Sequence, residues 1–259
     1  MKPRYRTIQP NDLRGIGDPV VVATFMRSGT HLTMDLLRRQ FSSFASWKRP
    51  LEALDSLYLP VDVLLPGWEP ADWNTKRVLD VLRRPKRPIL KTHFLDADLG
   101  NLRQSQPAVA DWLEQRATVL YVTRDLRQVL PSLWAFLQDW RPEQAGAFDE
   151  AFVRHWSHQA LQHRDGWRCR PLLCELDYAQ LTGDPLDSLR RLGDWLNEAP
   201  LLRQPLLPRP LSSRWQSRCL RLFACDSEST AILASRQTPS WNPAWNQLLQ
   251  SVCPSESSS

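Results

Sequence analysis

The chain has 259 residues, a length that suits one large α/β domain with a sizeable hydrophobic core. Lys and Arg number 33 against 28 Asp and Glu, and this excess of +5 is spread along the chain instead of forming the basic stripe of a nucleic-acid-binding surface. The five cysteines contain no CxxC pair, the N-terminus lacks the apolar segment of a secretory signal, and no apolar run is long enough to span a membrane. These features disfavour a disulfide framework, a zinc site, a nucleic-acid partner and integral membrane association, and they favour the cytoplasm.

Residues 20–41 combine a short strand, a glycine turn and a helix. The run from Val20 to Ala23 is typical of a buried parallel strand, and leucines recur at helical spacing after Gly29. This arrangement directs backbone N–H groups at an anion, while Arg27 adds a charge and Ser28 and Thr30 add hydroxyls. The segment has neither Walker A nor GxGxxG spacing. It is interpreted as a loop for a phosphate-type group, although alone it would fit an ordinary turn equally well.

The rest of the chain alternates between strand-like and helix-like patterns. Strands are predicted at 88–94, 117–123 and 172–176, and helices at 104–116, 126–140, 147–164 and 184–197. Pro131 implies either a helix start close to it or a kink, and Asp184 and Pro185 are the predicted N-cap and first residue of the last helix. The alternation predicts a central parallel sheet flanked by helices, with ligands beyond the carboxyl ends of its strands. Arg27, His93 and Arg124 fall at or just past such ends and are expected to share one site.

The remaining segments are less regular. Residues 1–18 are expected to form an irregular lead-in, 19–250 the domain, and 251–259 a disordered tail. Residues 42–87, rich in proline and tryptophan, favour the wall of a binding cleft as much as a loop folded down for packing, and 140–150 are a further candidate wall. Helical periodicity is only loose around 216–235.

Four motifs, in order over residues 19–197, resemble those of sulfotransferases that use 3′-phosphoadenosine 5′-phosphosulfate (PAPS). FMRSGTH resembles the family's 5′-phosphosulfate loop, and PILKTHF resembles its KTH strand. VLYVTRDLRQVLPSLWAFL is similar to the 3′-phosphate segment, in which a serine follows an arginine by eight residues, as Ser132 follows Arg124. DYAQLTGDP is similar to the turn before a helix. The resemblance implies a three-layer α/β, P-loop-NTPase-like sulfotransferase fold.

The resemblance also implies roles for individual residues. His93 is the implied general base, Lys91 neutralises charge on the bridging oxygen, and Tyr178 either packs beside the nucleotide or belongs to the core. Arg124 and Ser132 are implied to hold the 3′-phosphate. The implied 5′-phosphosulfate site, in which Arg27 is also catalytic, consists of Arg27, Ser28, Gly29, Thr30 and His31, with His31 either a phosphate donor or a helix cap. The donor is PAPS, no metal is needed, and the expected partner is a small acceptor with an apolar part.

The sequence also departs from the family pattern. Leu32 stands where a tryptophan usually stacks on adenine, and Arg27 replaces the usual lysine. The C-terminal RKGxxGDWK loop has no counterpart, and five arginines are candidates to replace it: Arg209, Arg214, Arg218, Arg221 and Arg236.

Three other interpretations remain open. The departures leave open a non-catalytic relic that binds a phosphoadenosine nucleotide, and the missing Walker lysine argues against a nucleotide kinase. His155 and His158 could pair on a metal, but a solvated helix face, shared with His163, is the favoured interpretation.

Overall fold

A parallel sheet forms the centre of the molecule. The structure is a computed structural model that describes residues 7–46, 54–65, 73–208 and 239–252. Within these ranges five strands pair in the order β2-β3-β1-β4-β5, and every pairing is parallel. The strands are β1 (Val20–Thr24), β2 (Leu59–Pro60), β3 (Ile89–Thr92), β4 (Thr118–Thr123) and β5 (Leu173–Asp177).

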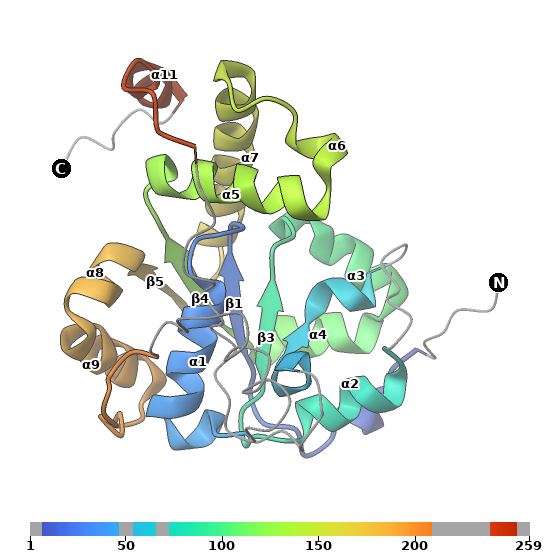
Figure 1. Cartoon of the computed structure of the whole chain (residues 1–259). Coiled ribbons are helices and arrows are strands. Elements are labelled where there is room, and N and C mark those ends of the chain that lie inside the picture. The colour runs from blue at the N-terminus through green and yellow to red at the C-terminus, as the bar shows by residue number, and fades with distance from the viewer. Residues whose placement is uncertain (1–6, 47–53, 66–72, 209–238, 253–259) are drawn as a thin grey trace.

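Helices lie on both faces of the sheet and beyond one end of it. Helices α1 and α9 pack on one face, and α2 and α4 pack on the other. Helices α5, α6, α7 and α11 gather beyond the carboxyl ends of the strands (Figure 1). The predicted α/β class with a central parallel sheet is therefore confirmed. The helices are α1 (Thr30–Gln40), α2 (Thr75–Leu82), α3 (Leu99–Ser105), α4 (Pro107–Arg116), α5 (Leu126–Trp140), α6 (Pro142–Ala145), α7 (Glu150–Arg168), α8 (Tyr178–Gly183), α9 (Pro185–Leu196) and α11 (Trp245–Val252).

The position of β1 at the centre of the sheet explains why its sequence is a run of apolar residues. All five of its side chains are buried. Val20 and Val22 join the cluster that includes α1 and α9, whereas Val21 and Ala23 join the cluster that includes α2 and α4. Because both faces of the sheet are covered, apolar residues fill both sets of alternating positions from Val20 to Ala23.

Several helix boundaries differ from the predicted ones. The helix predicted at 104–116 is two helices, α3 and α4, because the residue before a proline disfavours the helical region; Gln106 has φ −139° and ψ 67°. The helix predicted at 147–164 begins at Glu150, after Asp149 accepts the Phe152 N–H, and ends at Arg168. Pro131 lies inside α5, which runs on through it. Asp184 caps α9 as predicted, accepting the Asp187 N–H at 3.1 Å.

The segment 42–87 contains more regular structure than its prolines predict. It holds the edge strand β2 and the helix α2, whose N-cap Asn74 accepts the Arg77 N–H at 2.9 Å. The predicted lead-in contributes Ile8 and Ile16 to the core. The predicted periodicity at 216–235 lies outside the described residues, as does the predicted tail apart from Ser251 and Val252, which end α11.

Candidate functional site

The loop between β1 and α1 turns sharply at the carboxyl edge of the sheet. Arg27 has a left-handed φ of 69° and Gly29 one of 108°, and the Ser28 N–H donates to the Phe25 carbonyl at 3.2 Å. The hydroxyls of Thr24 and Thr30 share a hydrogen bond of 2.5 Å across the loop. The loop is thus closed on itself, and the first turn of α1 presents N–H groups that have no acceptor within the helix.

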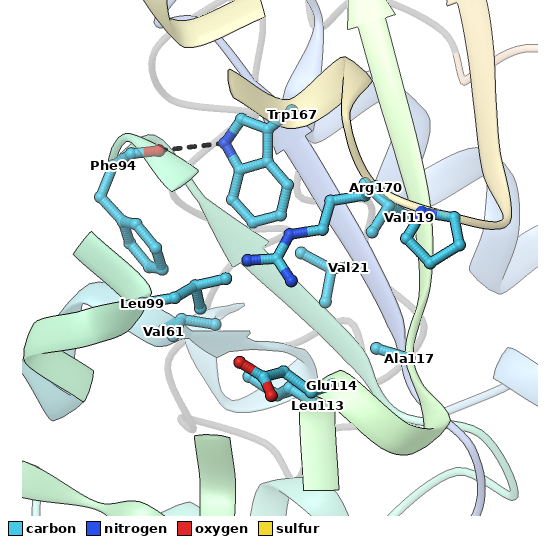
Figure 2. Close-up of a pocket in the computed structure, with 11 residues that line it drawn as sticks. Val21, Val61, Phe94, Leu99, Leu113, Glu114, Ala117, Val119, Trp167 and Arg170 are labelled. Atoms are coloured by element: carbon cyan, nitrogen blue, oxygen red, sulfur yellow. Dashed lines mark hydrogen bonds between the residues drawn. The ribbon is translucent and has the colours of Figure 1, made fainter. Parts of the chain in front are cut away.

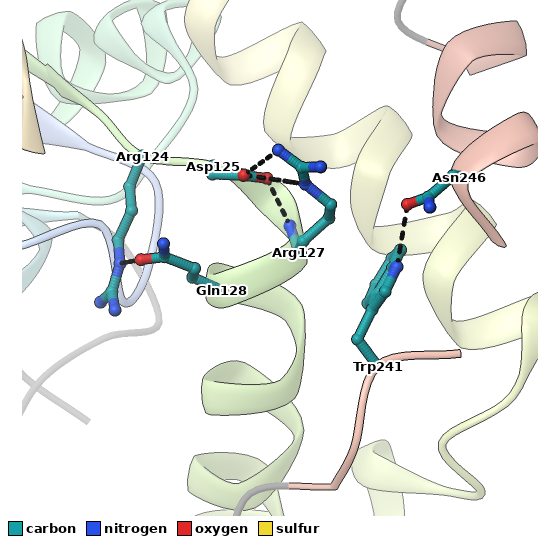
Figure 3. Close-up of polar contacts among 6 residues, drawn as sticks. All are labelled: Arg124, Asp125, Arg127, Gln128, Trp241 and Asn246. Carbon is teal, nitrogen blue, oxygen red and sulfur yellow. Dashed lines mark hydrogen bonds and ion pairs between the residues drawn. The ribbon is translucent and has the colours of Figure 1, made fainter. Parts of the chain in front are cut away.

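Two arginines from neighbouring strands meet at this loop. Arg124, which follows β4, donates to the Arg27 carbonyl at 3.1 Å and to Gln128 Oε1 at 3.2 Å. The Arg27 side chain donates to Ser132 Oγ at 3.1 Å. Arg127 differs, because it folds back on Asp125 in an exposed ion pair (Figure 3). The predicted residues Arg27, Arg124 and Ser132 therefore come together, from β1, β4 and α5.

Tyr178 covers the loop glycine. A Cβ built on Gly29 would lie 2.5 Å from Tyr178 Cδ2, so only glycine fits beneath this ring. The ring also contacts Arg124, whose guanidinium carbon lies 4.4 Å from the ring centroid. Tyr178 thus joins the arginine cluster and also packs against the hydrophobic cluster that includes α1 and α9.

His93 lies on the other side of β1, just past the end of β3. Its Nδ1 is 2.8 Å from the Thr24 carbonyl oxygen, which can only accept, so Nδ1 carries the proton. Burial, followed by the charge of Lys91, lowers the pKa of His93 well below its usual 6.5. The imidazole is therefore neutral at neutral pH, with its lone pair on Nε2.

The structure also places His31 and His163. His31 is the second residue of α1, whose N-cap is Gly29, so the alternative in which His31 caps the helix is wrong. The His31 ring lies edge-on to the Tyr58 ring, with 5.8 Å between the two ring centroids. His163 does not share the exposed face of His155 and His158 on α7. It is buried and hydrogen-bonded to the Tyr121 hydroxyl at 2.9 Å.

Asp62 is a residue of this region that the sequence motifs do not indicate. It follows the short strand β2, and its carboxylate accepts a hydrogen bond from Thr92 Oγ1 at 3.3 Å. Burial raises its pKa to about 6, and the nearby Lys91 charge works in the opposite direction. The only available signal is tertiary, namely the pairing of β2 with β3.

A pocket opens on the flank of the sheet next to Phe94 (Figure 2). Apolar side chains such as Val21, Val119 and Leu99 line most of it, and Arg170 crosses it. Trp167 Nε1 donates to the Phe94 carbonyl at 3.1 Å. Val21 and Val119 are the second residues of their strands, so the pocket extends from the residue after His93 toward the amino ends of the sheet.

The described ranges contain neither a metal-binding cluster nor a membrane-spanning helix. Within residues 7–46, 54–65, 73–208 and 239–252, no group of three or more His, Cys, Asp or Glu side chains is placed to hold a metal ion. In the same ranges no helix is long and apolar enough to cross a membrane. The candidate arginines Arg209, Arg214, Arg218, Arg221 and Arg236 lie outside the described residues.

Comparison with known proteins assigns the fold. No protein-family model and no curated protein matches the sequence. Among solved structures, mouse sulfotransferase SULT7A1 in complex with PAP aligns over 96% of this chain and 90% of its own, with 14% identity and a TM-score of 0.54. The sulfotransferase domain of the curacin biosynthetic pathway covers 93% of this chain and 98% of its own at 11% identity (TM-score 0.47). Sulfotransferase STF1 from Mycobacterium tuberculosis aligns over 94% of this chain and 78% of its own, with 12% identity and a TM-score of 0.47. The match to SULT7A1 carries the assignment, and the chain has the fold of the PAPS-dependent sulfotransferases.

Proposed function

We propose that this protein transfers a sulfuryl group from PAPS to a hydroxyl or amine of a small acceptor. The observation that carries the proposal is the convergence of Arg27, Arg124, Ser132 and Tyr178 on the Gly29 loop. Two permanent cations, a hydroxyl and the first turn of a helix form a donor set that fits a nucleotide with several anionic groups. The shared fold supports the same nucleotide class, because SULT7A1 was crystallised with PAP.

Arg27 and the start of α1 bind the 5′ end of the nucleotide in this proposal, and Arg124 with Ser132 binds the 3′-phosphate. Ser28, Gly29, Thr30 and His31 complete the 5′ site, in which Gly29 allows Tyr178 to pack close to the loop. PAPS supplies the sulfuryl group. The protein contributes in-line positioning and charge stabilisation.

His93 and Lys91 act on the reacting groups. The acceptor's oxygen or nitrogen forms a bond to sulfur while His93 Nε2 takes its proton, and the bond from sulfur to the bridging oxygen breaks to leave PAP. The neutral imidazole, with Nδ1–H held by the Thr24 carbonyl, is the form that can accept this proton. The ammonium of Lys91, two residues earlier, compensates the charge that develops on the leaving group.

The acceptor's apolar part is proposed to lie against Phe94 and the pocket that begins there. A series of phenols with lengthening alkyl chains tests this proposal. The KM should fall with chain length, and Leu99→Trp, which fills the pocket from the start of α3, should abolish that trend without changing PAP affinity. A KM that is independent of chain length contradicts it.

Calorimetric titration with PAP, AMP and ATP is the first test of the proposed function. PAP should bind at least tenfold more tightly than AMP, because only PAP carries the 3′-phosphate. Transfer from labelled PAPS to an acceptor panel then tests catalysis.

Other results would favour a different function or contradict the proposed one. PAP binding without transfer to any acceptor would favour a phosphoadenosine-binding relic, and phosphoryl transfer from ATP with magnesium would favour a nucleotide kinase. An equal affinity for PAP and AMP would contradict the proposed nucleotide.

A further inference from the structure

Asp62 reaches the site through strand pairing. It lies in the 3-10 helix Val61–Leu64, directly after β2. That strand runs parallel to β3, with Leu59 opposite Leu90 and Pro60 opposite Lys91. The register therefore delivers Asp62 to the carboxyl end of β3, beside the residues that carry the proposed chemistry.

The Asp62 carboxylate orders the turn that holds His93. It accepts a hydrogen bond from Thr92 Oγ1 at 3.3 Å. The same Thr92 oxygen accepts the Phe94 N–H at 3.1 Å. One side chain from the edge of the sheet thus fixes Thr92, and through it the residue on the far side of His93.

Asp62 is also an acidic group in a largely apolar setting. Burial raises its pKa to about 6, while the Lys91 charge and the Thr92 hydrogen bond lower it, so the carboxyl is mostly ionised at neutral pH. A buried carboxylate is costly unless cations and donors surround it. The Lys91 charge and the Thr92 hydroxyl favour the ionised form, and the charge of Asp98 opposes it.

We propose that Asp62 is a positioning residue of the sulfuryl-transfer site: it is the counter-ion of the Lys91 ammonium and the acceptor that, through Thr92, fixes the turn at His93. The proposal rests on the proposed function for what Lys91 and His93 do, but the Thr92 hydrogen bond and the strand register do not depend on it. In this proposal Asp62 acts through Lys91 and Thr92 and is assigned no contact with the donor or the acceptor.

The lysine content of the chain makes the counter-ion role directly measurable. The sequence has five lysines, Lys2, Lys48, Lys76, Lys86 and Lys91. After reductive ¹³C-dimethylation each lysine gives a resolvable NMR signal, and Lys91→Arg assigns the signal of interest. The unliganded protein is titrated through the alkaline range, in which Asp62 is fully ionised.

Asp62→Asn removes the charge and keeps an oxygen that can accept the same hydrogen bond. It should lower the pKa of Lys91 by about one unit, the smaller end of the effect of a close opposite charge. Asp98→Asn is the matched control, because Asp98 is a neighbouring acid whose carboxylate accepts the Leu95 N–H; it should shift the pKa of Lys91 much less. Asp62→Glu should restore most of the Lys91 pKa.

Amide hydrogen exchange tests the second half of the proposal. Asp62→Ala should speed exchange of the Phe94 N–H, which donates to the Thr92 hydroxyl, at least tenfold and leave the amides of β1 unchanged, whereas a general loss of stability would speed both. An identical Lys91 titration in wild type and Asp62→Asn, or an unchanged Phe94 exchange rate in Asp62→Ala, overturns the proposal. Both measurements use unliganded protein, so a wild type that fails to bind PAP would defeat the proposed function and not this one.

Discussion

At the scale of single residues, the proton on His93 is assigned by one backbone oxygen. The Thr24 carbonyl can only accept, so it selects the Nδ1–H tautomer, and burial keeps the ring neutral. Thr24 ends β1 and His93 follows β3, so the hydrogen bond connects two adjacent strands. The sheet itself therefore sets the protonation state of the proposed base.

Replacing His93 should separate catalysis from nucleotide binding. His93→Ala should lower kcat at least a hundredfold for any acceptor that the wild type sulfates, because the proton acceptor is lost. The dissociation constant of PAP, measured by calorimetry, should change less than threefold. His158→Ala, an exposed histidine on α7, is the control and should change neither value. Retention of full turnover in His93→Ala would contradict the assigned role.

Arg124 should determine selectivity for the 3′-phosphate. Arg124→Ala should weaken PAP about tenfold to a hundredfold, the usual range for a lost hydrogen bond to a charged group, and weaken AMP much less. Calorimetry with both nucleotides measures the difference. Arg127→Ala is a close control, because Arg127 lies three residues later but pairs with Asp125. Equal weakening of PAP and AMP by Arg124→Ala would mean that Arg124 supports the loop and does not bind this phosphate.

At the scale of elements, the β1–α1 loop and α8 fit together through one glycine. Gly29 has a positive φ of 108°, and its missing Cβ leaves the space that Tyr178 occupies at the start of α8. Gly15 also has a positive φ, 80°, but nothing lies within 4 Å of its Cβ position. The two glycines therefore separate the cost of backbone strain from the cost of a steric clash.

Alanine at both positions should show this separation. Gly15→Ala should cost about 1 kcal/mol of unfolding free energy, from backbone strain alone. Gly29→Ala should cost about 2–4 kcal/mol, because overpacking against Tyr178 is added. In urea denaturation the double variant Gly29→Ala/Tyr178→Ala should lose less than the two single variants combined. If the losses of unfolding free energy in the two single variants simply add up in the double variant, the Tyr178 ring moves aside for the alanine at position 29 at no cost in free energy.

The sequence predicts the elements whose signals are local. Buried parallel strands need apolar side chains on both faces, so β1, β3 and β4 are recognisable as runs, whereas the edge strand β5 is partly buried and gives a shorter run. By contrast, β2 has two residues, one of them a proline, and becomes a strand only by pairing with β3.

The site residues likewise divide into those with a local sequence signal and those placed by tertiary pairing. Arg27, His93 and Arg124 follow recognisable strands, so the chain order alone predicts that they lie at one edge. Neither the role of Asp62 nor the contact of Tyr178 with Gly29 could be predicted, because each depends on the register or order of strands that are distant in sequence.

At the scale of the whole molecule, buried titratable groups give opposing responses to pH. The pKa of Asp62 is raised from 3.8 to about 6, so the folded state holds this proton more tightly than the unfolded state does. Its contribution to stability therefore falls as the pH rises from 3.8 to about 6. Burial lowers the pKa of His163 from 6.5 to about 4, so the unfolded state takes up this proton first. Its contribution is lost as pH falls from 6.5 toward 4.

His163 should therefore supply one measurable part of the acid response, in the same direction as His93. It joins α7 to β4 through the Tyr121 hydroxyl, and a shift of this size corresponds to about 3 kcal/mol of unfolding free energy. His163→Gln keeps a partner for Tyr121 but cannot be charged. The unfolding free energy of His163→Gln minus that of wild type, from urea denaturation, should rise by about 3 kcal/mol between pH 7.5 and pH 4. The contributions of Asp62 and His93 cancel in this difference, because both proteins contain them, and His158→Gln controls for the loss of an exposed imidazole. If the unfolding free energies of His163→Gln and wild type change in parallel with pH, His163 is protonated in the folded state at no cost in stability. Other groups would then account for the destabilisation by acid.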